Sequence, residues 1–524
     1  MDVPGYIWLG VTAVFGGPEL AFGLPVTPFM ILAGFILGIL VGATPGLAGP
    51  MAMAISLPIL ISTFGYTPDA LLPVLGFLIG VMKGATIGGS VPAILFNTPG
   101  TPDAYMTTLD GHPMAQNGQA GRALRIAHLS SASGDTFSDV VLILCAPFLA
   151  ILVEQYLDLP EKTALLILSL AFIASVIGRS TGKGLISLGL GLFAVSIGSG
   201  QDFYPRLSFG TQTLSDGFSV TSAVLGVLII GEVFKGLEEL RRDARYGIQP
   251  SGAGLQGDQR LQPGDLRRIA PFIARSSLIG TVVGALPGVG STLAATLGYA
   301  SGKALHRRSG RSPAFGTGAP EGIAATEAAN SSVSGANLIP VLSLGIPGNA
   351  AAVFLILAME SIGGFNPGPS VFRFSAESVN PELVIAFGLF TTMMVANVLN
   401  WTVGGVFMRS VGFMIRIPKQ ILLPVVLLLT LTSIYVGNPK LSEIWIAIGF
   451  GIIGYLMRRL DMSPLPFVIA FILGGRLEDT ARQSFEATGA DPFFLFTSPI
   501  AATFMAIALL VIVFSLRSKR KTAS

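Results

Sequence analysis

Long apolar stretches, separated by short polar segments, recur along the whole chain of 524 residues. Several approach the roughly 18–20 residues that an α-helix needs to cross a bilayer, and uncharged flanks extend the shorter ones to that length. They include residues 142–153, 163–177, 383–399, 421–436, 444–457 and 493–515. The pattern predicts an all-α polytopic membrane protein with roughly 10–12 membrane crossings.

Two of the apolar stretches return later in the chain with nearly the same sequence. The segment GILVGATPGLAG (38–49) recurs as GTVVGALPGVGS (280–291), 242 positions further on. A second pair, VPAILFNTPG (91–100) and IPVLSLGIPG (339–348), keeps the same order at an offset of 248 positions. The two ordered pairs predict an internal duplication. We expect a first membrane repeat over residues 1–235, and a second repeat with C-terminal helices over residues 272–524.

The charges of the two repeats predict opposite orientations. No Lys or Arg precedes Lys83, so the first Pro-Gly hairpin, about residues 25–64, has no basic residue at its ends. The second hairpin, about residues 269–304, lies in a region with eight basic residues between Arg260 and Arg311. Because basic loops stay in the cytoplasm, the two hairpins are expected to enter the membrane from opposite faces, as inverted repeats. The polar segment 236–271 and the basic C-terminal tail are then both cytoplasmic.

Composition agrees with a membrane environment and weakens enzyme interpretations. Hydrophobic residues make up 51% and charged residues 12% of the chain, whereas soluble domains carry roughly 25% charged residues. The single Cys145 excludes an internal disulfide and a cysteine metal cluster. The three His residues are scattered, and the segment GRSTGKG (178–184) lacks the spacing of a Walker A motif. We expect no metal, no cofactor, no nucleic-acid partner and no catalytic residues.

Pro-Gly pairs at the ends of the repeated segments predict helix breaks inside the membrane, as broken helices or re-entrant hairpins. The free N–H groups and the dipole at the start of the next half-helix favour an anion, whereas the carbonyls ending the preceding one favour a cation. Inverted repeats with broken helices are the usual plan of a secondary transporter's site. The rows of glycines before the breaks, such as Gly38 and Gly42, favour close helix packing instead.

We therefore predict an anion-binding substrate site at the breaks. Its candidate residues are Pro45, Gly46, Asn97, Thr98, Pro99, Gly100, Thr101, Pro287, Gly288, Ser291, Pro347, Gly348 and Asn349. Glu327 lies in a small, polar run just before the last break, and with Asn330 it is a candidate ligand of a coupling cation. A cap on the cytoplasmic side is the alternative role of Glu327. Most other charged residues beside apolar stretches, Lys83 among them, are expected at the membrane interfaces.

Several motifs, in their order along the chain, resemble the large membrane subunit of the tripartite tricarboxylate transporters. They are GATPGLAG, NTPGTPDA, LDGHPMAQNGQAGRAL, APEGIAATEAAN and LGIPGNAA, and the resemblance runs from Leu20 to about Phe514. It implies a multi-pass secondary transporter of the bacterial inner membrane that takes up a di- or tricarboxylate, or a related organic acid. It also implies two partners, a small membrane subunit of about four helices and a periplasmic substrate-binding protein. A cation gradient would drive uptake, and sodium is the cation that the resemblance favours.

Two other classes of function stay open at this stage. An intramembrane enzyme acting on a lipid-linked substrate would need paired carboxylates or a metal-binding set facing one cavity. A non-transporting membrane scaffold would use the glycine rows for packing alone. The sequence leaves open which carboxylate is taken up, the ion stoichiometry and the oligomeric state.

Overall fold

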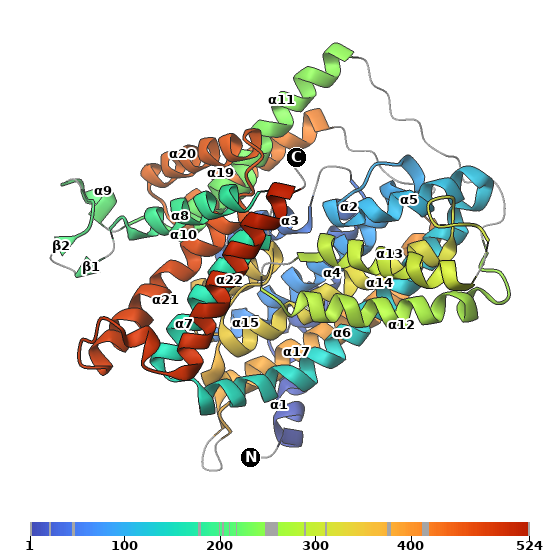
Figure 1. Ribbon diagram of the computed structural model, residues 1–524. Coiled ribbons are helices and arrows are strands. Elements are labelled where there is room, and N and C mark those ends of the chain that lie inside the picture. The colour runs from blue at the N-terminus through green and yellow to red at the C-terminus, as the bar shows by residue number, and fades with distance from the viewer. Residues whose placement is uncertain are drawn as a thin grey trace. The chain divides into compact units, whose positions relative to one another are not determined.

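The protein is almost entirely helical, with one short two-stranded antiparallel hairpin (Figure 1). The computed structural model describes residues 3–19, 23–44, 48–176, 180–198, 200–201, 204–208, 210–215, 217–246, 260–287, 290–309, 312–374, 379–410 and 419–521. The predicted all-α class is confirmed.

The chain divides into two compact units, and each takes one segment from each half of the sequence. Unit 1 comprises Met1–Ala150 and Ile248–Ile417, and unit 2 comprises Ile151–Gly247 and Pro418–Ser524. The predicted repeats and linker are continuous ranges of the sequence, whereas each compact unit combines two separate ranges. The repeat boundaries stay a prediction.

Unit 1 holds all of the predicted helix breaks. Its elements are α1 (Val3–Phe15), α2 (Val26–Gly42), α3 (Gly49–Phe64), η1 (Pro68–Ala70), α4 (Leu71–Phe96), η2 (Pro102–Ala104), α5 (Tyr105–Met114), η3 (Ala115–Gln119), most of α6 (Ala120–Tyr156), α12 (Asp265–Gly284), α13 (Gly290–Ser309), α14 (Pro320–Ala336), α15 (Leu338–Leu344), α16 (Ala350–Ile362), η5 (Pro369–Phe372), α17 (Pro381–Leu399), η6 (Asn400–Gly404) and α18 (Gly405–Ser410). The helices are interrupted between α2 and α3, α4 and α5, α12 and α13, and α15 and α16, as the Pro-Gly pairs predict.

Glycines bring the helix before each first break close to a later helix of the same predicted repeat, α2 to α4 and α12 to α14. On α2, Gly38 and Gly42 face the backbone of α4, where an added Cβ would collide with main-chain atoms of Ala85. On α12, Gly280 and Gly284 face the backbone of α14 in the same way. Figure 1 shows α12, α13 and α14 side by side. The packing role that the sequence indicates for these glycine rows is confirmed.

Helices α4 and α14 run in opposite directions, as two landmarks show. Near the end of α4, the Ile94 carbonyl lies 3.1 Å from Nδ1 of His112, and the start of α14 is bonded to the neighbouring Asp110. The middle of α4 contacts Asp139, and the end of α14 contacts the same residue. Moving along α4 therefore leads from Asp139 toward Asp110, whereas moving along α14 leads from Asp110 toward Asp139.

Ion pairs hold together the N-termini of α6, α12 and α14. Arg122 on α6 donates two hydrogen bonds to Asp265 at the start of α12, at 2.9 and 2.6 Å. Arg268 on α12 donates to both carboxylate oxygens of Glu321 on α14, at 2.5 and 3.0 Å. Paired fork-to-carboxylate bonds are strong and directional, so they fix this end of the unit.

Unit 2 contains the remaining elements. They are α7 (Leu159–Val176), α8 (Thr181–Ser196), β1 (Gly200–Gln201), β2 (Tyr204–Pro205), α9 (Gln212–Ser215), α10 (Val220–Leu225), η4 (Gly226–Ile230), α11 (Gly231–Tyr246), α19 (Lys419–Gly437), α20 (Leu441–Arg459), α21 (Leu465–Ala487), η8 (Phe494–Phe496) and α22 (Pro499–Lys521). Helix α21 packs on α7 and α8, and α20 packs on α10, η4 and α11. An ion pair between Arg458 on α20 and Glu232 on α11, at 2.6 Å, links these two helices.

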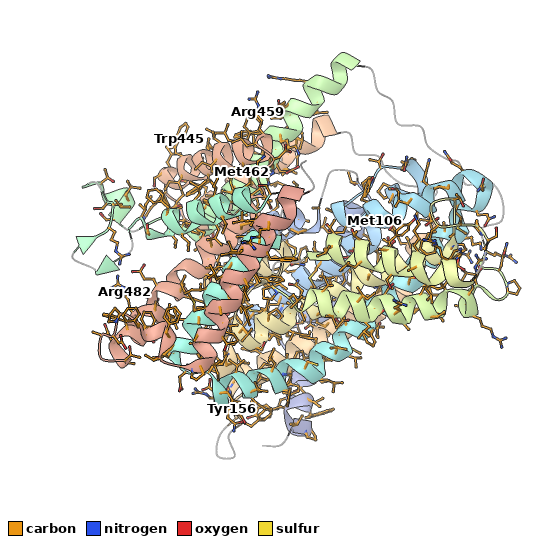
Figure 2. All side chains as sticks on the ribbon, in the orientation of Figure 1. Met106, Tyr156, Trp445, Arg459, Met462 and Arg482 are labelled. Atoms are coloured by element: carbon orange, nitrogen blue, oxygen red, sulfur yellow. The ribbon has the colours of Figure 1, made fainter. Side chains whose placement is uncertain are left out.

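Six stretches of the described residues are long and apolar enough to cross a membrane. They are Pro68–Phe96, Tyr105–Tyr156, Val220–Glu238, Pro381–Met408, Leu441–Arg459 and Pro499–Arg517. Shorter apolar helices, including α2, α3 and α16, accompany them. Large exposed side chains such as Trp445 on α20 and Tyr156 on α6 (Figure 2) suit contact with lipid rather than water. The total number of crossings stays a prediction.

Candidate functional site

A cavity of about 70 Å³ lies inside unit 1, between segments from the two halves of the chain. Its polar lining comes from Thr86, Thr101, Asp103, Ser291, Asn330, Ser334 and Asn349. None of the described residues that line it is a Lys or an Arg.

The N-termini of three helices border this cavity. Helix α3 contributes Gly49 and Pro50 from its first turn, α13 contributes Ser291, and α16 contributes its N-cap Asn349 and Ala351. The first N–H groups of a helix have no partner within the helix, and its dipole places partial positive charge there. The three helix N-termini therefore favour an anion, although none of the described lining residues is basic.

Asn349 caps a helix beside the cavity. Its Oδ1 accepts a hydrogen bond from the Ala352 N–H at 2.9 Å and caps helix α16. The cap uses the acceptor end of the carboxamide and leaves the Nδ2 group as a donor beside the cavity. Thr101, which is 7% exposed, approaches from the first half of the chain and adds a hydroxyl.

Two carboxylates accompany the cavity. Asp103 lines it and accepts a hydrogen bond from Thr292 at 2.5 Å. Glu327 is fully buried, accepts a bond from Thr107, and has no partner at Oε2 among the described residues. One turn further along α14, Asn330 lines the cavity and its Nδ2 is likewise without a partner. The Glu327 carboxylate and the carboxamide oxygen of Asn330 are ligands that suit a small hard cation, whereas the Nδ2 group can only donate a hydrogen bond.

The structure brings part of the predicted site together. Thr101, Ser291, Asn330 and Asn349 line the cavity, and Glu327 lies in the same helix as Asn330. Glu327 is buried in the middle of α14, away from the helix ends, and its role stays a prediction.

Of the other predicted residues, those that the structure describes do not line the cavity. Asn97 and Thr98 are exposed at the end of α4, and Pro99, Gly100, Pro287, Pro347 and Gly348 are not among the residues that line the cavity. Gly100 and Gly348 instead pack tightly, because an added Cβ would collide with Gly42 and Asn337 respectively. Pro45, Gly46 and Gly288 lie outside the described residues.

Asp110 is a buried residue that sequence reasoning missed. Its Oδ1 accepts hydrogen bonds from the backbone N–H groups of Gly316, Gly318 and Ala319, at 2.8, 3.0 and 2.8 Å, and Tyr299 donates to Oδ2 at 3.0 Å. A carboxylate at a helix N-terminus accepts hydrogen bonds from N–H groups that have no partner within the helix, and it interacts favourably with the helix dipole. The side chain thus caps α14 from the other half of the chain. The motif LDGHPM contains this Asp, but only the three-dimensional contact reveals its role.

Lys83 lies in a different environment from the one that the sequence suggests, and Asp103 is a lining residue that the sequence does not indicate. Lys83 belongs to a group of charged residues most of which are expected at membrane interfaces, but its own side chain is completely buried against Asp135 and Asp139. The spacing of these two aspartates by four residues on one helix was the available signal. Asp103, in the tripeptide Pro-Asp-Ala after the second break, gave no comparable signal. Among the described residues, no group of three or more His, Cys, Asp or Glu side chains is placed to hold a metal ion.

Comparison with known proteins places the chain in a family. The sequence profile of the tripartite tricarboxylate transporter TctA family matches residues 29–469. An uncharacterized 52.8 kDa protein from the TAR-I ttuC' 3' region of Agrobacterium vitis is 32% identical over 516 residues, which is 96% of this chain and 97% of the relative. A second uncharacterized protein from the same organism, from the TAR-II ttuC' 3' region, is 30% identical over 249 residues, 46% of this chain and 97% of its own length. No solved structure matches. The chain, a membrane transport protein and not an enzyme, belongs to the tripartite tricarboxylate transporter TctA family.

Proposed function

We propose that the chain is the large membrane subunit of a binding-protein-dependent secondary transporter that takes up a di- or tricarboxylate, or a related organic acid, together with a cation. The observation that carries this proposal is the cavity bordered by the N-termini of α3, α13 and α16. We expect sodium to be the cation.

The substrate's carboxylate groups would be held by backbone and neutral side chains. An anion of several charges cannot enter the membrane interior without compensation, since a single charge at the bilayer centre costs several kcal/mol. Helix N-termini, with the Thr101 and Ser291 hydroxyls and the Asn349 carboxamide, supply donors at the cavity. Typical ligand pockets exceed about 300 Å³, so we expect the surrounding helices to move apart when substrate enters.

The coupling cation would balance the charge that these donors leave uncompensated. Among the described residues, the cavity lining carries the Asp103 carboxylate and no basic side chain. The buried Glu327 lies one helical turn before Asn330, which lines the cavity. A carboxylate substrate would add further negative charge. We propose that Glu327 and Asn330 ligate the cation, with Asp103 as an additional ligand. Bound cation then raises substrate affinity, and bound substrate raises cation affinity to the same extent.

The inverted repeat is part of the proposal. Its support is the opposite direction of α4 and α14, which correspond in the repeated sequence, and the repetition of the glycine-packed pairs α2–α4 and α12–α14. Inversion would bring the half-helices of both repeats to one site from opposite faces of the membrane.

The family implies a tripartite system with other subunits. We propose that these are a small membrane subunit of about four helices and a periplasmic substrate-binding protein, and that the system lies in a bacterial inner membrane. Between units 1 and 2, unit 1 is the candidate for substrate handling, because the cavity lies within it.

The proposal is tested by uptake into vesicles that contain the reconstituted complex with its two partners. Labelled di- and tricarboxylates are supplied with an inward sodium gradient, an inward potassium gradient or no gradient. We expect accumulation of at least one carboxylate with sodium only. An assembled complex that accumulates none of them would favour a scaffold, and chemical conversion of a lipid-linked compound would favour the intramembrane enzyme.

A further inference from the structure

A second group of buried charges lies in unit 1, apart from the carboxylates of the cavity. The Nζ of Lys83 on α4 lies 2.9 Å from Oδ1 of Asp135 and 2.7 Å from Oδ2 of Asp139, both on α6. It also donates to Oδ1 of Asn397 on α17 at 3.0 Å. All four residues are at most 2% exposed.

The charges of this cluster do not balance. Two carboxylates face one ammonium group, and the other elements packed around them contribute neutral groups: Ser334 and Gly335 from α14, Asn397 from α17 and Asn400 from η6. His128 is a further titratable side chain beside Asn400, and its Nε2 lies 2.9 Å from the backbone carbonyl oxygen of that residue. An uncompensated buried charge is far more costly than a neutral polar group.

Among the described residues, one carboxylate oxygen of the cluster has no hydrogen-bond partner. Asp135 accepts hydrogen bonds from Lys83, from Ser334 and from Asn400, the last at 3.2 Å. Asp139 accepts bonds only at Oδ2, from Lys83 and from Asn397, each at 2.7 Å. Its Oδ1 is buried and has no partner among the described residues.

We propose that Asp139 binds an exchangeable proton, so that the Lys83–Asp135–Asp139 cluster is a proton site distinct from the cation site at Glu327. A proton leaves one carboxylate for one ammonium and makes the buried cluster neutral. A metal cation fits less well, since the ammonium already lies between the two carboxylates. Moreover, Oδ1 of Asp139 lies against Gly335, where even an added Cβ would collide with it.

One residue connects the proton site to the cavity. Ser334 lines the cavity, and its hydroxyl donates to Oδ1 of Asp135. A ligand that draws this hydroxyl toward the cavity removes a donor from the Asp135 carboxylate. The negative charge of the cluster is then less well stabilised, and the cluster holds its proton more tightly. The proton site itself does not depend on which ligand the cavity takes.

The test is infrared difference spectroscopy of the full-length protein in lipid nanodiscs, between acidic and alkaline buffers. A protonated Asp139 gives the carbonyl stretching band of a carboxylic acid, which shifts on exchange into D₂O. We expect this band in the wild type and its loss in Asp139→Asn. Asp135→Asn is also expected to lose it, because one carboxylate then faces one ammonium and Asp139 stays ionised. Ser334→Ala is expected to retain the band to higher pH than the wild type.

Controls keep the outcomes separable, and none of them requires transport. Among the described residues, Glu327 is another fully buried carboxylate with an unpartnered oxygen, so it is the alternative source of such a band. Glu327→Gln should keep the band, because Asp139 is unchanged in this variant. Each variant is compared at equal fold, checked by size-exclusion chromatography and thermal unfolding. The proposal is overturned if the wild type lacks the band, or if Asp139→Asn and Asp135→Asn both keep it. A band that responds to exchange of NaCl for choline chloride at constant pH in Glu327→Gln, which lacks the proposed cation ligand, would make the cluster a sodium site, and this also overturns the proposal.

Discussion

Asn97 and Gly345, 248 positions apart, end their helices in the same left-handed conformation, with φ of 52° and 70°. The residue after each also closes the same bond: the Thr98 N–H donates to the Pro92 carbonyl and the Ile346 N–H to the Pro340 carbonyl, both at 3.2 Å. The two helix ends are thus alike in sequence position, conformation and hydrogen bonding. Only glycine and, less readily, asparagine adopt this conformation at little cost.

The first prediction follows from this backbone geometry. Asn97→Gly should fold and transport like the wild type, whereas Asn97→Val should lose about 1–2 kcal/mol of stability, because a β-branched residue is strained at positive φ. Thermal unfolding of the purified variants measures the difference. Thr98→Val, at the next position, is the control. Equal stability of Asn97→Val and Asn97→Gly would show that the strain is absent.

The second prediction concerns Asn349 as a donor to the substrate. Asn349→Ala should reduce the apparent substrate affinity about ten- to a hundred-fold, the loss expected for a hydrogen bond to a charged group. The control is Asn380→Ala, because Asn380 also caps a helix with its side chain, accepting from the Glu382 N–H at 3.0 Å, but does not line the cavity. Uptake at varied substrate concentration distinguishes the two. Similar losses in both variants would assign the effect to helix capping alone.

The third prediction concerns Asp103 as a cation ligand. Asp103→Asn should raise the sodium concentration for half-maximal uptake about tenfold, which corresponds to roughly 1.4 kcal/mol. The chain supplies a matched control in Asp69, which occupies the same Pro-Asp-Ala tripeptide in another short 3₁₀ turn but is exposed and outside the cavity. Asp69→Asn should leave the sodium dependence unchanged. If both variants behave alike, Asp103 has no specific role in cation binding.

The fourth prediction is the opposite orientation of the two Pro-Gly hairpins. Single cysteines at Tyr66 and at Arg307 should be labelled from opposite sides by a membrane-impermeant thiol reagent. The exposed Cys145 must first be replaced by serine, and the cysteine-free protein serves as the blank. Intact right-side-out and inverted vesicles give the two readouts. Labelling of both positions from one side would refute the inverted repeat.

The fifth prediction uses the pair that joins α6 to α12. Burial alone would raise the pKa of Asp265, but hydrogen bonds from Arg122 and the Gln262 N–H outweigh it and hold the pKa of that carboxyl below its usual range. Because the folded-state value lies below the unfolded one, the stabilisation is complete above the ordinary Asp pKa of about 4 and is lost as pH falls through the folded-state value.

Thermal unfolding at a series of pH values tests this dependence. We expect Arg122→Gln to lower the unfolding temperature at neutral pH and to reduce its further fall in acid. The control is Arg125→Gln, one helical turn away, which forms no comparable pair with any residue that the structure describes. An acid dependence in Arg122→Gln identical to that of the wild type would mean that Asp265 titrates without influence from Arg122.

Local signals were enough to locate the helix breaks. The predicted hairpins at 25–64 and 269–304 correspond closely to α2–α3 and α12–α13, because proline and glycine act on their own stretch of backbone. Part of the site followed from the same reasoning, since Thr101, Ser291 and Asn349 lie directly after breaks and reach the cavity.

Contacts between distant segments were not accessible in this way. A lysine in an apolar stretch is usually found at an interface, and only the fold shows that Asp135 and Asp139 lie opposite Lys83. The same holds for Asp110, whose partners lie some 200 positions away. Conversely, Asn97 was predicted to bind substrate through its side chain, whereas its backbone conformation explains the choice of residue.

The origin of each unit from two separate segments has a consequence for biosynthesis. Residues 1–150 leave the ribosome long before residues 248–417, with the first segment of unit 2 made in between. Lys83 is therefore made together with its ion-pair partners Asp135 and Asp139, but before its hydrogen-bond partner on α17. Asp110 is made before the backbone donors at the start of α14. Until those helices arrive, the early segment must be held by the insertion machinery or by its own glycine-packed pair α2–α4. Ribosome stalling within residues 151–247 should therefore leave a protease-sensitive, chaperone-bound intermediate rather than a folded half.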